Sequence, residues 1–160
     1  MRRMPALTGA PVRVDLVRGL RDRRGPVHAG SFLRDRQIAL DCARAEFPRI
    51  FVHEVAHFIW LRLGNPLRIR YEDVVRGEIA ARARGELGWS AEWRKNALRA
   101  DDVGGRSRHW REYCCESFCD TAAWLYSGVK GHKEFTLGAR WRRGRRTWFA
   151  ESIDSRTLSI

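Results

Sequence analysis

Apolar and polar residues alternate in three short stretches of the chain, and this alternation is typical of half-buried strands. The stretches are residues 12–16, 38–42 and 67–71. In the last of them, Leu67, Ile69 and Tyr71 are separated by arginines. The sequence therefore predicts three extended segments.

Three polar stretches contain the glycines and prolines that favour turns and loops. Residues 1–11 include Pro5, Gly9 and Pro11 and are expected to be loose. Residues 18–31 are expected to form a Gly-rich loop or a short, weak hairpin. Residues 101–106 contain two adjacent glycines and are expected to be a loop.

Other stretches have the apolar spacing of helices, with start and stop signals at their ends. They are residues 48–63, 73–84, 90–99 and 107–128, followed by an ambiguous tail from residue 134 for which a helix is preferred. Pro48 suits the first turn of the first helix, and Gly64 with the following Asn-Pro ends it. Ser90 and Ser107 have the side chains of N-caps. No repeat or domain boundary is visible, so residues 1–160 are expected to form one domain.

The composition is that of a globular but strongly basic protein. The chain has 160 residues, of which 44% are hydrophobic, and seven are tryptophans, so it can bury a core. It has 31 Lys and Arg residues against 19 Asp and Glu residues, a formal net charge of +12. Such a charge attracts nucleic acid, acidic lipid or an acidic partner. Because the arginines are scattered along the chain, a solvated basic surface is the preferred interpretation.

The cysteines and the apolar runs bear on where the protein works. Three of the four cysteines lie within residues 114–119, on one predicted helix, where they cannot easily link distant segments. The N-terminal residues lack the apolar run of a signal peptide, and no stretch reaches the ~20 apolar residues that span a bilayer. We therefore expect a reduced, cytoplasmic protein with no membrane partner.

The motif His53-Glu54-Val55-Ala56-His57 stands within the otherwise apolar segment 49–61. On a helix, residues four apart project side by side, so the two histidines can bind one metal ion. Glu54 lies about 100° away around the helix, where its carboxylate can reach a water on that metal without binding the metal itself. Burying these polar groups costs several kcal/mol unless partners satisfy them, and a metal ion would do so. The HExxH pattern therefore predicts a metal site of the kind that metal hydrolases use.

A catalytic zinc site needs a third protein ligand. The metzincin arrangement, with a third histidine shortly after the motif, is excluded because the corresponding position is Leu63. The other usual source is a glutamate on a second helix. At about 100° per residue, one face of the predicted helix 107–128 has polar residues. They are His109, Glu112, Tyr113, Glu116 and Asp120. The opposite face is apolar and would pack, through Cys114, Phe118, Ala122 and Leu125.

HEVAH, followed on a later helix by Glu116-Ser-Phe-Cys-Asp120, resembles the gluzincin zinc peptidases, and most closely the ImmA/IrrE-like metallo-endopeptidases. The resemblance implies that Glu116 is the third zinc ligand and that Asp120 accepts a hydrogen bond from His53, which would orient that ligand. Glu112, one turn earlier, competes for the ligand role, but only Glu116 has an aspartate four residues later.

Two other sets of residues could contribute to the chemistry of the site. Cys115 and Cys119 are four residues apart and could bind a soft metal, but the paired Cys-x-x-Cys of zinc deaminases is absent, so buried structural thiols are preferred. Tyr113 and His109 are candidates by face for the donor that would share the oxyanion charge of a transition state.

The function expected from these residues is zinc-dependent hydrolysis of peptide bonds, with one Zn²⁺ per chain, Glu54 as general base and a peptide or protein as substrate. The expected fold is an α+β zincin-like domain. In it, a small, mainly antiparallel sheet packs on the HExxH helix and on a second long helix.

The alternative is a non-catalytic regulator that keeps this fold and binds nucleic acid or a DNA-binding repressor through its basic surface. Arginines alternate with an aromatic residue in residues 140–146, as on some nucleic-acid-binding surfaces. A purely structural zinc site is disfavoured, because such a site needs no general base.

Overall fold

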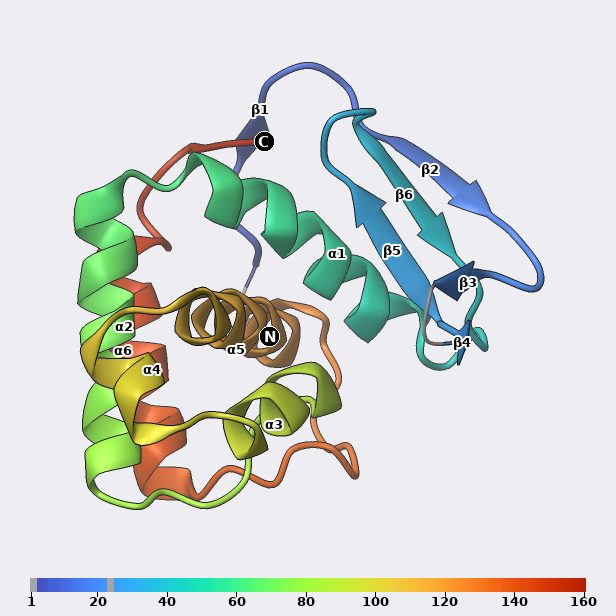
Figure 1. Cartoon of the computed structure of the whole chain (residues 1–160). Coiled ribbons are helices and arrows are strands. Elements are labelled where there is room, and N and C mark those ends of the chain that lie inside the picture. The colour runs from blue at the N-terminus through green and yellow to red at the C-terminus, as the bar shows by residue number, and fades with distance from the viewer. Residues whose placement is uncertain (1–2, 23–24) are drawn as a thin grey trace.

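The computed structural model describes residues 3–22 and 25–160, which form six helices and seven short strands in an α+β arrangement (Figure 1). The helices are α1 (Phe47–Arg62), α2 (Asn65–Ala80), α3 (Trp89–Asn96), α4 (Ala100–Gly104), α5 (Arg108–Tyr126) and α6 (Ala139–Ser152). The strands are β1 (Leu7–Thr8), β2 (Arg13–Leu16), β3 (Arg21–Asp22), β4 (Gly25–Pro26), β5 (Ala29–Phe32), β6 (Gln37–Leu40) and β7 (Leu158–Ser159). None of the described helices is both long and apolar enough to cross a membrane.

The largest sheet has three strands in the order β2-β6-β5. Strand β5 is antiparallel to β6, whereas β2 is parallel to it, with Val14 opposite Ile38. The sheet is therefore mixed, and the expectation of a mainly antiparallel sheet is wrong. The parallel pairing arises because the chain passes through β3, β4 and β5 between β2 and β6, so these two strands are not joined by a hairpin.

Helix α1 lies between this sheet and the long helix α5 (Figure 1). Ile38 and Leu40 of β6 are fully buried against it, together with Phe58 of α1 and Phe118 of α5. The apolar face expected for α5 is buried as predicted. The strong burial on both sides of α1 explains why its polar residues need internal partners.

Several predicted ends are confirmed. Pro48 stands in the first turn of α1, and the helix ends at Arg62, just before Gly64. The side chain of Ser107 accepts a hydrogen bond from the Trp110 N–H at 3.3 Å, as expected of an N-cap. The tail forms helix α6, in agreement with the preferred interpretation.

Four local predictions are wrong. Residues 67–71 lie within helix α2, because Asn65-Pro66 starts a helix and Tyr71 and Val75 are buried at helical spacing. Residues 101–106 include the short helix α4. Ser90 does not cap α3, whose N-cap is Gly88.

The fourth error concerns the N-terminal segment. Residues 7–8 pair in parallel with residues 158–159 near the C-terminus, so the part of residues 1–11 that the structure describes is held in place; residues 1–2 lie outside the described residues. The hairpin expected within residues 18–31 is present as the antiparallel pair β3–β4, although residues 23–24 lie outside the described residues. Strand β5 in the same segment was not predicted, since Ala-Gly-Ser-Phe has no apolar alternation.

A buried polar network joins α6 to the rest of the helical layer. Arg145 is fully buried and forms ion pairs with Glu78 at 2.6 Å and with Glu86 at 2.7 Å. The hydroxyl of Tyr113 donates a hydrogen bond to Glu86 at 2.6 Å. Because these charges are paired within the protein, the network is stable as a unit but sensitive to the loss of one member.

Candidate metal centre

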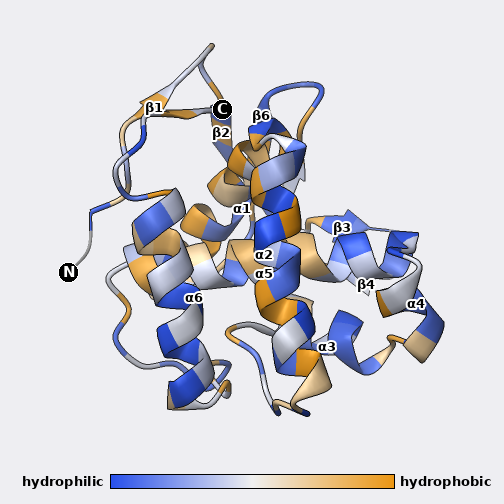
Figure 2. Ribbon diagram, turned by 90° about the vertical axis from the view of Figure 1, so that its left-hand side faces the viewer, coloured by the Kyte–Doolittle hydropathy of each residue, from blue (hydrophilic) through white to orange (hydrophobic). Residues whose placement is uncertain are grey.

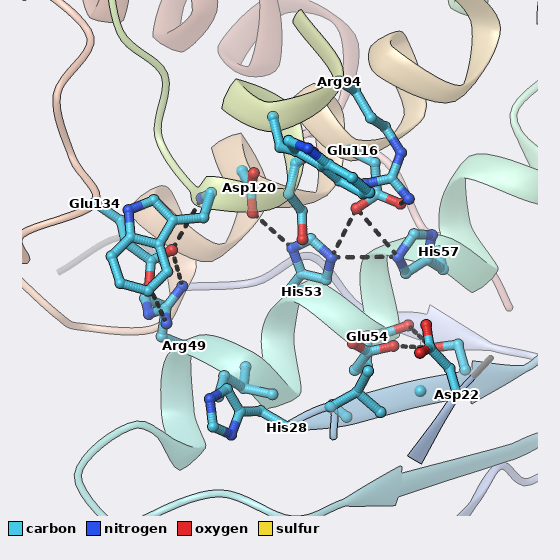
Figure 3. Close-up of a pocket in the computed structure, with 18 of the residues that line it drawn as sticks. Asp22, His28, Arg49, His53, Glu54, His57, Arg94, Glu116, Asp120 and Glu134 are labelled. Carbon is cyan, nitrogen blue, oxygen red and sulfur yellow. Dashed lines mark hydrogen bonds and ion pairs between the residues drawn. The ribbon is translucent and has the colours of Figure 1, made fainter. Parts of the chain in front are cut away.

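The two histidines of the HEVAH motif lie side by side on α1, and their Nε2 atoms are 3.2 Å apart. His53 is buried, and His57 is half-buried. Both rings project from α1 toward α5 (Figure 3). The helix thus presents two imidazole nitrogens to one small volume, as the four-residue spacing predicts.

Asp120 of α5 holds the first histidine in place. Its Oδ1 atom accepts a hydrogen bond from Nδ1 of His53 at 2.8 Å, the bond that the family resemblance implies. Its Oδ2 atom accepts a hydrogen bond from the backbone N–H of Ala91 at 3.1 Å, at the start of α3. With the proton on Nδ1, the lone pair of His53 Nε2 is directed away from Asp120 and is available to a metal.

Glu116 lies one turn before Asp120 on α5 and faces both histidines (Figure 3). Its Oε2 atom is 3.3 Å from Nε2 of His53 and 3.9 Å from Nε2 of His57. Two imidazole nitrogens and one carboxylate oxygen therefore form a triangle with edges of 3.2, 3.3 and 3.9 Å. Such a set of donors suits a divalent transition-metal ion.

Arg94 of α3 binds the other side of the same carboxylate, with Nη2 3.1 Å from Oε1 of Glu116. Burial alone would raise the pKa of Glu116, but in the protein without metal the hydrogen bond from a doubly protonated His53 and the charges of His57, His53 and Arg94 lower it to about 2. Glu116 is therefore ionised at neutral pH, and Arg94 leaves Oε2 directed at the histidines.

Cys119 also approaches the centre. Its sulfur and one nitrogen of each histidine all lie within 4.8 Å of one another, so His53, His57 and Cys119 form a group that could hold a metal ion. The neighbouring Cys115 lies with its sulfur 3.5 Å from Nδ1 of His57. All four cysteines are free thiols. The structure thus places a thiol close to the histidines, where the sequence favoured purely structural cysteines.

Glu54 is buried on the side of α1 that faces the sheet, and its side chain lines the same pocket as the histidines. Ser31 of β5 donates a hydrogen bond to Oε2 of Glu54 at 2.5 Å. The same hydroxyl is 2.9 Å from the backbone carbonyl oxygen of Glu54. Strand β5 therefore fixes the orientation of the carboxylate at the pocket wall.

The pocket has a volume of about 690 Å³ and is bounded by α1, α3, α5 and strand β5. This volume is within the range of sites that bind small molecules or a few residues of a peptide. The side chains that could hold a metal ion thus open into a cavity that is large enough for a substrate.

Three residues on the polar face of α5 lie away from the pocket, contrary to the expectation that they face the metal. Tyr113 is buried with its hydroxyl on Glu86. His109 is largely exposed, with Nδ1 3.5 Å from Asp102, and Glu112 pairs with Arg108 on the surface. The physical reason is that α1 crosses α5 near residues 115–120. Side chains that lie about one to two turns before Glu116 on α5 are therefore too far along the helix to reach the histidines.

The basic segment 140–146 lies on α6, none of whose residues lines the pocket. Much of α6 is hydrophilic in Figure 2. Trp141 is half-buried beneath Arg140, whose guanidinium carbon is 4.7 Å from the ring centroid. An arginine of the segment thus stacks on its aromatic side chain, which reduces the ring surface that is left for stacking with a base.

Two residues that line the pocket carried no signal in the sequence. Arg94 is one of many arginines, and Ser31 lies in a segment without a clear pattern. The spacing of Cys119 from Cys115 allowed a ligand of a soft metal, but its approach to the histidines depends on how α1 and α5 cross. Only the tertiary arrangement brings Arg94 to Glu116, Ser31 to Glu54 and Cys119 to the histidines.

No family model, curated protein or solved structure matches this chain. Membership of the ImmA/IrrE-like endopeptidases therefore stays a prediction, and the function must be argued from the geometry of the site.

Proposed function

We propose that this protein is a zinc-dependent metallopeptidase. The observation that carries the proposal is the triangle formed by His53 Nε2, His57 Nε2 and Glu116 Oε2, in the same pocket as the carboxylate of Glu54. Two histidines, a glutamate and a nearby carboxylate base are the parts that zinc hydrolases of the HExxH type require.

The distances fit a tetrahedral zinc site. Zinc–nitrogen and zinc–oxygen distances of about 2.0–2.2 Å place two ligands of a tetrahedron about 3.4 Å apart. The observed edges of 3.2 and 3.3 Å lie close to this value, and the edge of 3.9 Å needs only a small side-chain shift. Asp120 adds the hydrogen bond to Nδ1 that zinc-bound histidines usually make.

When bound, a zinc ion supplies a Lewis acid that makes water a better nucleophile near neutral pH and polarises a carbonyl group. In the proposed reaction, Glu54 would take the proton of the attacking water and pass it to the leaving amine. Ser31 donates a hydrogen bond to Oε2 of Glu54 and so restrains this carboxylate. Arg94 fixes Glu116 from the side away from the histidines, which keeps the ligand in place during turnover.

The third ligand is tested by metal content. Purified wild type is expected to bind about one zinc per chain, and Glu116→Gln is expected to bind it much more weakly. Glu112→Gln, one turn earlier on the exposed side of α5, is the matched control and should bind zinc like the wild type. If Cys119→Ser loses zinc while Glu116→Gln retains it, the thiol is the third ligand and an open catalytic site of the proposed type is refuted.

The reaction is tested with Glu54→Gln. This variant should keep the zinc and lose hydrolysis of unstructured peptides, since the amide cannot accept the proton of water. Cleavage that survives the substitution would contradict the mechanism. A protein that binds zinc, cleaves nothing and binds DNA in a salt-sensitive manner after metal removal would instead be the non-catalytic regulator.

A further inference from the structure

Two tryptophans on α3 stand beside the candidate metal centre with much of their surface in water. Trp89 is 55% exposed and Trp93 is 57% exposed, and both line the pocket. The other five tryptophans of the chain are buried or half-buried. Since the two exposed residues are four apart on one helix, their indoles project on the same side. Exposed aromatic surface at a pocket is a mark of a binding site.

Helix α3 is attached to the rest of the protein through several groups besides these indoles, and the ammonium group of Lys133 lies 4.8 Å from the ring centroid of Trp89. The backbone N–H of Ala91 donates to Asp120, and Arg94 pairs with Glu116, so α3 is bound to the two residues of α5 that face the histidines. The backbone N–H of Trp89 donates to Glu134 at 3.0 Å. The indoles are thus presented on a rigid support whose position is tied to the metal centre.

Strand β5 forms the opposite wall of the pocket. It is the edge strand of the three-stranded sheet, and Ala29, Gly30 and Ser31 line the pocket with small side chains. An edge strand can pair with an extended peptide through its backbone N–H and C=O groups, and small side chains allow the peptide to approach. A peptide held here would lie between the edge strand and the tryptophans, above Glu54 and the histidines.

The two arginines that line the pocket are already paired with carboxylates of the pocket. Arg49 forms an ion pair with Glu134 at 3.0 Å, and Arg94 forms one with Glu116 at 3.1 Å. These two arginines are therefore not available to select an acidic substrate, in spite of the basic character of the whole chain. The indoles are the largest recognition surface that remains.

We infer that the pocket selects extended peptides with a large apolar or aromatic side chain next to the bond to be cleaved, and that this side chain packs on Trp89 and Trp93. The inference rests on the proposed function for the position of the cleaved bond. The binding preference itself depends only on the pocket and can be measured without turnover.

The test uses the full-length Glu54→Gln protein loaded with zinc, so that peptides bind without being cleaved. Calorimetry compares an unstructured hexapeptide with a central phenylalanine against the same peptide with alanine or glutamate at that position. We expect the phenylalanine peptide to bind at least tenfold more tightly. Trp89→Ala and Trp93→Ala, each added to Glu54→Gln, should remove most of that preference while keeping the zinc content.

Leu61→Ala is the matched control, because Leu61 is 49% exposed but lies outside the pocket. It should leave the preference unchanged. Equal binding of the three peptides, no peptide binding at all, or tryptophan variants that keep the full preference would each overturn the inference.

The wild type, assayed with the same peptides, separates this inference from the proposed function. A phenylalanine preference in binding that depends on the tryptophans, together with no cleavage by the zinc-loaded wild type, would refute the peptidase and leave the recognition surface established. Cleavage by the wild type without a preference for the phenylalanine peptide would support the peptidase and refute the recognition surface.

Discussion

Substitution of Asp120 by asparagine probes the metal centre most sharply, because the aspartate has two separate partners and asparagine has nearly the same shape. Oδ1 accepts the hydrogen bond from His53, and Oδ2 accepts one from the backbone N–H of Ala91. Asparagine has only one oxygen. The backbone N–H can only donate, so the oxygen must turn to Ala91 and the amide NH₂ must face His53.

An amide donor opposite Nδ1 of His53 favours the tautomer with the proton on Nε2, and that nitrogen then has no lone pair for a metal. Loss of the orienting partner of a metal-bound histidine typically weakens metal binding 10- to 100-fold. This corresponds to about 1.4–2.7 kcal/mol of binding free energy. The backbone hydrogen bond at Ala91 is retained, so the metal-free protein should lose no more than about 1 kcal/mol of unfolding free energy.

Zinc affinity is measured by competition with a chromophoric chelator, the His53 tautomer by long-range ¹H–¹⁵N NMR, and stability by urea unfolding of the metal-free protein. Asp102→Asn is the matched control, since Asp102 accepts a backbone hydrogen bond from Arg99 at 2.8 Å but lies outside the pocket. It should leave zinc affinity unchanged. Wild-type zinc affinity in Asp120→Asn, with His53 still protonated on Nδ1, would refute this account of the centre.

Three further predictions concern the groups that support the site. Gly88→Ala should lower the unfolding free energy by about 1–3 kcal/mol and weaken zinc binding, because a Cβ at this position would lie 2.2 Å from the aspartate that holds the first histidine. Gly77→Ala, inside α2 with no atom within 4 Å, is its control and should stabilise by up to about 1 kcal/mol in urea unfolding. Arg145→Met should cost about 3–5 kcal/mol at pH 7, since it leaves buried Glu78 without its ion-pair partner and takes from buried Glu86 one of its two cations, the other being Lys95; a loss below 1 kcal/mol by the same assay would contradict this. Glu72 of α2 forms an ion pair with Arg106 at 2.7 Å and accepts a hydrogen bond from the indole N–H of Trp110 at 3.2 Å. Burial raises the pKa of Glu72, but these hydrogen bonds outweigh it and lower the pKa below its ordinary value. The stability advantage of wild type over Glu72→Gln should therefore be full at pH 7 and shrink as the pH falls through that lowered pKa; a gap that is the same at pH 7 and pH 3 would argue against the ion pair.

Local sequence patterns predicted the ends of several helices and the relative positions of side chains within a single helix. The spacing of His53 and His57 decides that their rings lie side by side, because backbone hydrogen bonds fix the helix geometry wherever the helix packs. Pro48 and Gly64 mark the ends of α1, and Ser107 starts α5. These features depend on residues within one or two turns of one another, so they can be recognised without knowledge of the fold.

Local patterns failed where a neighbouring element supplies the partner. The start of α3 is set by the carboxylate of Asp120 and not by Ser90, and a Cβ at Gly88 would collide with that carboxylate. Residues 67–71 alternate like a strand but are helical, because burial of Tyr71 among the helices outweighs the alternation. Strand β5 has no pattern of its own and forms by pairing with β6.

The sequence by itself determined that two histidines lie side by side on one helix with a carboxylate next to them, and that a second helix has a polar face that could meet them. It could not determine which part of that face meets the histidines. That choice follows from the crossing of α1 and α5, in which His53 lies against Asp120 and His57 against Cys115, so the helices run antiparallel at the centre. Packing therefore places Glu116, and not Glu112, next to the histidines, and it brings Arg94 and Cys119 close to them. Contacts between elements depend on where their buried surfaces cross, and no periodicity along the chain encodes that crossing point.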